Sequence, residues 1–542
     1  MVIDARPDTH SSDPYSAGCQ PEVIAFLGNP ESYSHATGEV QRIETHGALI
    51  FLAGPNAYKL KRAVRLPYLD FSTIAKREAA CRNELKRNRH TAPDIYIDIV
   101  PVTREADGSL AIDGGGEAVD WLIVMNRFDQ TQLFDNLAVQ NRLDISVAEA
   151  LADCIANYHA HAAQHPDSDG YEIVAQIITQ IVSACNAAEK SGMQSATDLP
   201  GRMIVALNQK SWLLKARSKA GYVRLGHGDL HLRNIVLHNG KPTLFDAIEF
   251  DDALATIDVL YDLAFLLMDF WHRGLKAQAN RCFNEYVSIS MSAEALDGLA
   301  LMPLFMALRA SIRAMVAIDK LKVVSKPTAD TELDCAEAQD YFALATQFLN
   351  TSDPVLIAVG GLSGTGKTTL AAALAPRLGD APGALHLRSD VERKRMYNAN
   401  PLERLPSHAY SSTASHCVYR RLCDRADHAL QAGHSVIVDA VFLEPMYQHW
   451  IEQVARRAHC KFLGLWLEAD RDQLIERVTA RTHDASDATA DVVRTQLNAN
   501  DRFAECQSGG WPSIDTRGSR QDAVSRAERV ISEQLDRALL SD

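Results

Sequence analysis

Four side chains suited to acid–base chemistry and magnesium binding fall within Gly226–Phe250, which reads GHGDLHLRNIVLHNGKPTLFDAIEF. They are His227, Asp229, Asn234 and Asp246. A carboxylate such as that of Asp229 can accept the proton of an attacking hydroxyl group. The Asn234 amide oxygen and the Asp246 carboxylate suit magnesium, a hard cation that uses few protein ligands. These residue types predict a magnesium-dependent site with Asp229 as its base.

The segment that follows Asn234 predicts the element that positions this site. Ile235–Leu237 and Pro242–Phe245 are apolar, and His238-Asn239-Gly240 between them has the composition of a turn. Two such strands form a hairpin. The hairpin would deliver Asp246 beside Asn234, so that their oxygens can share one cation.

The spacing of these residues resembles the aminoglycoside phosphotransferase family, the small-molecule relatives of protein kinases. Their catalytic loop reads H-G-D-x-x-x-x-N and is followed by a metal-binding aspartate, as in His227–Asn234 and Asp246 here. The resemblance implies transfer of the γ-phosphoryl group of ATP to a hydroxyl group. Asp229 would be the catalytic base, and Asn234 and Asp246 the magnesium ligands. A polar loop before a surface hairpin is the alternative interpretation.

A lysine strand and a helix upstream are the expected nucleotide-binding partners. The predicted strand Ala57–Val64 carries Lys59 and Lys61 on one face, because strand side chains alternate. The helical pattern Ser72–Arg89 offers Glu84. In kinase-like folds a strand lysine holds the α- and β-phosphates and pairs with a helix glutamate. Lys59 is favoured slightly over Lys61, and solvated lysines are the alternative.

Other residues of this half have expected supporting roles. Met125–Phe128 would form the hinge that meets adenine. Glu249, at the expected mouth of the site, would attract a cationic substrate, although a solvated turn is an equal alternative. Asp258 and Asp262, four apart on an apolar helix, are expected to anchor the catalytic loop. No A-P-E motif follows Asp246, which favours a small substrate over a protein.

A second nucleotide site begins after the strand-like run Val355–Val359. Gly361, Gly366, Lys367 and Thr368 complete the pattern G-x-x-x-x-G-K-[ST], and an Ala/Leu-rich helix follows. Glycines let backbone amides surround a phosphate, and the helix N-terminus adds positive potential. Lys367 would reach the β/γ oxygens, and Thr368 would ligate magnesium. The expected phosphate-binding set is Gly361, Ser363, Gly364, Thr365, Gly366, Lys367, Thr368 and Thr369.

The residues after this loop predict a parallel sheet with a catalytic edge. Leu385–Leu387, Val436–Val438 and Phe462–Leu467 are strand-like and alternate with helical segments, which favours a doubly wound sheet. The pattern resembles small P-loop kinases such as gluconate kinase, chloramphenicol phosphotransferase, zeta toxin and the kinase domain of polynucleotide kinase. The resemblance implies that Asp390 and Arg393 serve the acceptor, with Asp390 as base and Arg393 steering a polar or anionic substrate. Asp439 would bind magnesium, and Arg477 and Arg481 would be lid arginines, with a solvated basic helix as the alternative.

Composition excludes several other classes of protein. The 542 residues are too many for one core and carry a formal net charge of −14, which argues against a nucleic-acid scaffold. The ten cysteines form no CxxC pair, as in a reduced cytosolic protein. The N-terminus lacks signal-peptide features, and the apolar run Leu299–Ile318 contains Pro303, Arg309 and Arg313. We expect a cytoplasmic protein with no membrane role.

The sequence therefore predicts two folded domains with different folds. Residues 1–19 are expected to be disordered, and 20–350 to form an α+β, protein-kinase-like, two-lobed domain. Residues 351–354 would be a linker, and 355–542 a doubly wound α/β P-loop domain. The predicted function is a bifunctional phosphotransferase that uses ATP and Mg²⁺ to phosphorylate small-molecule hydroxyl groups. The alternative is a nucleotide-binding regulatory or sensor protein in which one domain is catalytically silent.

Overall fold

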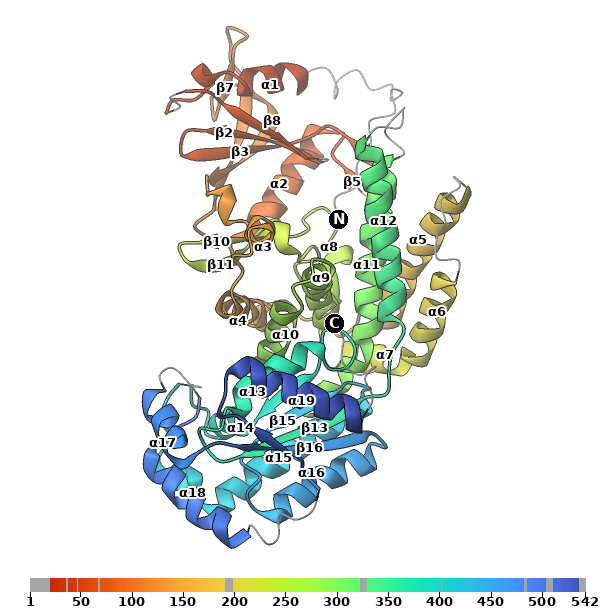
Figure 1. Cartoon of the computed structure of the whole chain (residues 1–542). Helices are drawn as coiled ribbons and strands as arrows, with labels where there is room; N and C mark the ends of the chain where they lie inside the picture. The colour runs from red at the N-terminus through yellow and green to blue at the C-terminus, as the bar shows by residue number, and fades with distance from the viewer. Residues whose placement is uncertain are drawn as a thin grey trace. The chain divides into compact units, whose positions relative to one another are not determined.

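The computed structural model describes residues 20–35, 38–45, 47–66, 69–190, 198–321, 329–400, 402–481, 485–503 and 510–535. The chain forms two compact units (Figure 1). The first unit runs to Arg273 and is completed by Leu304–Leu349. The second contains Gly274–Pro303 and the residues from Asn350 onward. The predicted disorder of residues 1–19 lies outside the described residues.

A six-stranded antiparallel sheet begins the first unit. Both faces of the sheet are covered: α1 (Gln20–Leu27) packs in the apolar cluster of one face and α2 (Ile74–Asn88) in that of the other. Thr73 caps α2 by accepting a hydrogen bond from the Lys76 amide. In spatial order the strands are β1 (Gln41–Glu44), β2 (Ala48–Ala53), β3 (Asn56–Lys61), β8 (Glu117–Asn126), β6 (Tyr96–Arg104) and β7 (Leu110–Ile112).

The rest of the first unit is mainly helical. The helix α9 (Val259–His272) is buried from Val259 to Trp271, as its nearly uninterrupted apolar sequence demands. The predicted hairpin is confirmed as β10 (Ile235–His238) and β11 (Lys241–Leu244). The other elements are β4 (Arg65–Leu66), β5 (Leu69–Asp70), α3 (Phe134–Val139), α4 (Ile145–His161), α5 (Gly170–Lys190), α6 (Leu199–Gln209), α7 (Ser211–Lys219), β9 (Val223–Leu225), α8 (Asp252–Ala255), β12 (Thr256–Asp258), α11 (Met302–Leu321) and α12 (Ala329–Phe348).

The second unit contains the predicted doubly wound parallel sheet. Its strands lie in the order β14 (Leu385–Arg388), β15 (Val436–Asp439), β13 (Val355–Gly361), β16 (Lys461–Glu468) and β17 (Ser513–Asp515), all parallel. Sequence reasoning missed β17, because three residues after Trp511-Pro512 give no periodic signal. Its helices are α13 (Lys367–Leu374), α14 (Ser389–Met396), α15 (Ser412–Gln431), α16 (Pro445–Arg457), α17 (Arg471–Ala480), α18 (Ala490–Phe503) and α19 (Arg520–Gln534).

The parallel sheet is covered by helices on both faces. Alternate residues of β13, Val355, Ile357 and Val359, pack in one apolar cluster with residues of α13 and α19. The helices α15 and α16 lie on the opposite side of the sheet from α13 and α19 (Figure 1). Burial on both faces explains why β13 reads as a continuous apolar run, the pattern typical of a central parallel strand.

The second unit also includes a segment that the sequence interpretation places in the first domain. The helix α10 (Lys276–Ser290) and the 3₁₀ segment Glu294–Leu301 belong to the P-loop unit. The Asn280 amide donates to the carbonyl oxygens of Pro382 and Ala384, both at 3.0 Å. The helical periodicity of α10 does not encode its partner, because an apolar helix face fits either core.

In the described residues, one helical segment, Glu294–Ile318, is long and apolar enough to cross a membrane by length and composition. Its most apolar window is 83% buried inside the protein. The segment contains Arg309, whose guanidinium lies 3.9 Å from the centre of the Tyr261 ring. Protein side chains therefore surround this segment.

Candidate active sites

Asp262 on α9 is hydrogen-bonded to the backbone of the loop that carries Asp229. The Asp262 carboxylate accepts hydrogen bonds from the backbone amides of His227 at 2.7 Å and Gly228 at 3.0 Å. It also lies 3.2 Å from Nε2 of His159, whose side chain is buried. Burial alone would raise the pKa of Asp262, but His159 and Arg309 hold it below its usual value. The prediction that Asp262 anchors this loop is confirmed, whereas Asp258 pairs with Arg217 and caps α9.

Asp229 and Asn234 face each other within the loop. The Asn234 amide nitrogen donates to the Asp229 carboxylate at 2.9 Å and to the Asp229 carbonyl oxygen at 3.0 Å. Because the nitrogen is used in this way, the amide oxygen of Asn234 is the group that can ligate a cation. His231, missed by sequence reasoning, places Nε2 3.4 Å from the same carboxylate.

Asp246 is held beside Asn234 in a left-handed backbone conformation, with φ of +60°. This conformation is uncommon for a non-glycine residue and persists only where neighbouring contacts impose it. The Phe245 amide donates to the Asn234 carbonyl oxygen at 3.0 Å, and the Ala247 amide donates to the Asn88 side chain, also at 3.0 Å. Bonds on both sides therefore hold Asp246 in place. Asn88 gave no signal in the sequence.

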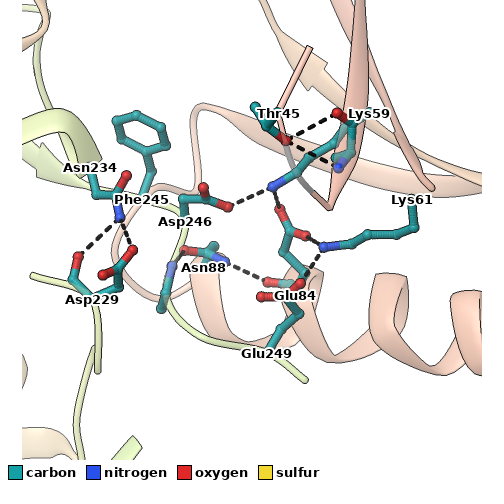
Figure 2. A network of polar contacts seen from close by, with 12 residues as sticks. Thr45, Lys59, Lys61, Glu84, Asn88, Asp229, Asn234, Phe245, Asp246 and Glu249 are labelled. Atoms are coloured by element: carbon teal, nitrogen blue, oxygen red, sulfur yellow. Dashed lines mark hydrogen bonds and ion pairs between the residues drawn. The ribbon is translucent and has the colours of Figure 1, made fainter. Parts of the chain in front are cut away.

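Both strand lysines meet Glu84 of α2 in one buried charge network (Figure 2). Lys59 lies 2.7 Å from Glu84 and 2.6 Å from Asp246. Lys61 pairs with the second oxygen of Glu84 and with Glu249. Although burial opposes the charged form, Asp246 and Glu84 raise the pKa of Lys59 well above its usual value. The helix glutamate thus joins the two lysines.

The structure places the two lysines differently with respect to Asp246. Lys59 reaches Asp246 and lines a cavity of about 80 Å³, whereas Lys61 points to Glu249 on the side away from Asp246 (Figure 2). Glu249, expected at an exposed mouth, is buried, and its pKa is raised by burial against the opposing charge of Lys61. Register alone could not separate the lysines, because both point to the same side of β3.

The cavity beside Lys59 is mainly apolar and is lined by the segment expected to be the hinge. Met125, Asn126, Arg127 and Phe128 all contribute to its wall. Adenine binding requires such an apolar slot next to backbone donors and acceptors. The remaining lining residues are Ile43, Ile50, Leu52, Ala57, Tyr96, Gln130, Phe245 and Asp246.

The glycine-rich loop after β13 forms a compact turn into α13. Gly361 and Gly364 have φ of +137° and +91°, and a Cβ on either would lie 2.7 Å from a backbone oxygen, of Leu467 and Leu474 respectively. Only glycine fits at these positions. Lys367 donates from Nζ to the Leu362 carbonyl oxygen at 2.9 Å, across the mouth of the loop. The loop therefore turns tightly from β13 into α13 and requires glycine at two of its positions.

Thr368 and Asp439 meet at the end of this loop. The Thr368 hydroxyl donates to the Asp439 carboxylate, which is buried at the end of β15. His386 on the neighbouring strand places Nε2 3.6 Å from the same carboxylate. Burial acts to raise the pKa of Asp439, but the contact with His386 and the charge of Lys367 hold it below its usual value. Sequence reasoning did not identify His386.

A cavity of about 600 Å³ extends from the P-loop to α14 and the residues before α18. This volume is within the usual range of small-molecule sites. Most residues of the predicted P-loop site line this cavity: Ser363, Gly364, Gly366, Lys367, Thr368, Thr369, Asp390, Asp439, Arg477 and Arg481. Burial raises the pKa of Asp390 above its usual value.

The arginines predicted to serve this site occupy different positions. Arg477 donates to the Thr516 carbonyl oxygen at 2.7 Å and to that of Gly364 at 3.5 Å, so it braces the P-loop as well as lining the cavity. Arg481 lines the cavity. Arg393 does not line the cavity. It donates to the Ala409 carbonyl oxygen at 2.6 Å, and its guanidinium lies 4.9 Å from the ring centre of Tyr410, which does line the cavity.

The oxygen groups of both sites fit magnesium. In the described residues, no group of three or more histidine, cysteine or acidic side chains is arranged to hold a metal. Magnesium bound with nucleotide needs only one or two protein ligands, because phosphates and water complete its shell. Asn234 with Asp246, and Thr368 with Asp439, supply such pairs. A bound magnesium ion would neutralise charge on the transferring phosphoryl group.

Comparisons with known proteins agree with both folds. A family model described as "Phosphotransferase enzyme family" matches residues 69–293, and one described as "AAA domain" matches residues 356–503. An uncharacterized protein of Mycobacterium tuberculosis is 28% identical over 496 residues, covering 90% of this chain and 94% of the relative. A Mycobacterium bovis protein matches with the same values.

Two of the similar solved structures are kinases by their titles. A choline/ethanolamine kinase family protein from Mesorhizobium loti covers 61% of this chain and 95% of its own, at 13% identity and a TM-score of 0.37. Shikimate kinase from Acinetobacter baumannii covers 34% and 97%, at 18% identity and a TM-score of 0.24. Residues 69–293 are thus similar to the phosphotransferase enzyme family and residues 356–503 to the AAA domain family, so the chain joins segments that match two different family models.

Proposed function

We propose that the chain is a bifunctional, ATP- and magnesium-dependent phosphotransferase whose two domains each phosphorylate a hydroxyl group of a small molecule. The observation that carries this proposal is the convergence of Lys59, Glu84, Asp229, Asn234 and Asp246 from separate segments of one unit. The second unit has its own phosphate loop beside a 600 Å³ cavity.

In the first domain, Lys59 is placed to hold the phosphates of the nucleotide, with Glu84 fixing its position. Asp229 accepts the proton of the acceptor hydroxyl, since its carboxylate is oriented by Asn234. Asp246 and the amide oxygen of Asn234 hold magnesium. Because Asp229 acts on the acceptor and Asp246 on the metal, the two aspartates have separable effects on catalysis and on nucleotide binding.

In the second domain, the P-loop amides and Lys367 bind the β- and γ-phosphates. Thr368 and Asp439 hold magnesium, and Asp390 accepts the acceptor's proton. Arg477 and Arg481 are close to the phosphate loop and stabilise negative charge on the transferring group. The acceptor oxygen bonds to the γ-phosphorus while the bond from that phosphorus to the β–γ bridging oxygen breaks, and ADP leaves.

A second candidate is a protein in which the first domain only senses nucleotide. The observation in its favour is that Lys59 contacts Asp246 directly, next to a cavity of only about 80 Å³. Nucleotide binding at this site would have to separate the pair. Under this candidate Asp229→Asn would change no product, whereas Asp246→Ala would still weaken nucleotide binding.

One experiment separates these candidates. The full chain is incubated with ATP labelled with ¹⁸O in the γ-phosphoryl group and a bacterial metabolite extract, and labelled products are identified by mass spectrometry. The wild type, Asp229→Asn and Lys367→Ala are compared. We expect each variant to lose a different set of products. Loss of every product in Lys367→Ala and of none in Asp229→Asn would leave only one active domain, and no labelled product from the wild type would refute the proposal.

A further inference from the structure

The wall of the P-loop cavity opposite the phosphate loop is rich in oxygen. In the part of the chain that the structure describes, this wall presents the hydroxyl groups of Ser389, Tyr410 and Ser486 and the carboxylates of Asp390 and Asp487. The Tyr410 hydroxyl donates to Asp487. Both carboxylates accept hydrogen bonds, and Tyr410 and Ser486 already bond to Asp487 and Asp390, so this wall mainly offers acceptors to a molecule seated here.

Two basic side chains of α14, Arg393 and Lys394, contact residues of this wall without lining the cavity themselves. Lys394 lies 2.8 Å and 2.9 Å from the two oxygens of Asp487, and its side chain is only 1% exposed. Arg393 is directed to the Ala409 carbonyl oxygen and lies beneath the Tyr410 ring. Neither lines the cavity. Their positive charge is used to position Asp487 and Tyr410.

Three cations line the described cavity. Lys367 belongs to the phosphate loop, Arg477 to α17, and Arg481 directly follows α17. Lys367 and Arg477 are bonded to the carbonyl oxygens of Leu362 and Gly364 in that loop. These groups match the charge of the nucleotide. A phosphate or carboxylate on the acceptor would instead meet the Asp390 carboxylate, and the repulsion between like charges would oppose its binding, whereas the charge of Asp487 is balanced by Lys394.

We propose that the acceptor of the P-loop domain is a small polyhydroxylated molecule, neutral or carrying an amino group, and without a phosphate or carboxylate group. This inference rests on the proposed function of that domain. In the reaction, one acceptor hydroxyl gives its proton to Asp390, while its oxygen bonds to the γ-phosphorus and the electron pair of the broken bond leaves with ADP. The other hydroxyl or amino groups donate to the oxygen-rich wall.

The test uses the full chain with the first site silenced by Asp229→Asn. A bacterial metabolite extract is separated by anion exchange at pH 8 into retained acids and unretained neutral and cationic molecules. Each fraction is incubated with γ-¹⁸O-labelled ATP, and labelled products are measured by mass spectrometry. We expect at least tenfold more Lys367-dependent product from the unretained fraction. More product from the retained acids would overturn this inference while leaving the kinase proposal intact, and no product from either would overturn both.

A variant tests the wall directly with the best acceptor from that fraction. Asp487→Asn removes the carboxylate held by Lys394 and Tyr410, and we expect the KM for the acceptor to rise at least tenfold while the Kd for ATP is unchanged. The control is Asp491→Asn, since the Asp491 side chain is 86% exposed on α18. An unchanged acceptor KM in Asp487→Asn would count against the proposed wall. Ser486→Ala provides a milder change with the same expected direction if Asp487→Asn fails to fold.

Discussion

Asn284 of α10 offers a sharp test of which core this helix stabilises. Its side-chain oxygen accepts a hydrogen bond from the His386 amide at 2.6 Å, at the start of β14. Its side-chain nitrogen donates to the Ala384 carbonyl oxygen at 3.2 Å. The side chain is buried, so water does not readily replace these bonds.

Replacing Asn284 with alanine should destabilise the P-loop unit. A buried amide left without its acceptor costs about 1–3 kcal/mol, and the lost donor adds about 1 kcal/mol. The sum, about 2–4 kcal/mol, corresponds to a roughly 30- to 700-fold change in a local opening equilibrium.

Hydrogen exchange followed by mass spectrometry measures this opening segment by segment. We expect Asn284→Ala to accelerate exchange in the peptides that contain β14 and β15, while those that contain β2 and β3 keep wild-type rates. Ile289→Ala is the matched control on the same helix, because Ile289 is 49% exposed. Unchanged exchange in β14, or acceleration confined to β2 and β3, would refute the assignment of α10 to the P-loop unit.

Three further predictions follow from single buried groups. Lys59→Ala should weaken Mg-ATP binding to the first domain by at least tenfold, measured by calorimetry in a Lys367→Ala background. Lys61→Ala should chiefly lower the melting temperature. An equal loss of Mg-ATP binding in both variants would contradict the different placement of the two lysines. Asp262→Ala should lower kcat of the first domain by about 10²-fold through loss of its two bonds to the catalytic loop, with ATP affinity nearly unchanged; wild-type kcat would show that the loop holds its shape without them. Burial lowers the pKa of His434 to about 4, so between about pH 6.5 and 4 the unfolded chain binds more protons than the folded chain. The free energy of unfolding should therefore fall by up to about 3 kcal/mol as the pH is lowered through that range. Denaturant unfolding of His434→Phe should show a flatter pH dependence, and an unchanged slope would be evidence against a neutral buried histidine.

The amino-acid sequence by itself determined the folds and much of the content of both candidate sites. The reason is local: His227–Asn234 and the P-loop act through short, fixed spacings, and each sits between elements with clear periodicity. The hairpin that delivers Asp246 was equally predictable, since Asn239-Gly240 defines its turn.

Only the tertiary structure decided which side chains of similar type have which partners. Lys59 and Lys61 point to the same side of β3, and their difference arises because Asp246 and Glu249 come from distant sequence. Arg393 is one helical turn from Asp390, yet its guanidinium contacts Ala409 and Tyr410 and does not line the cavity.

The membership of α10 in the P-loop unit was likewise decided in three dimensions. Its asparagines bond backbone atoms about one hundred residues away. Sequence periodicity specifies that a helix has an apolar face, but the surface that buries that face depends on shape and on buried hydrogen bonds. Those properties exist only once distant segments have come together.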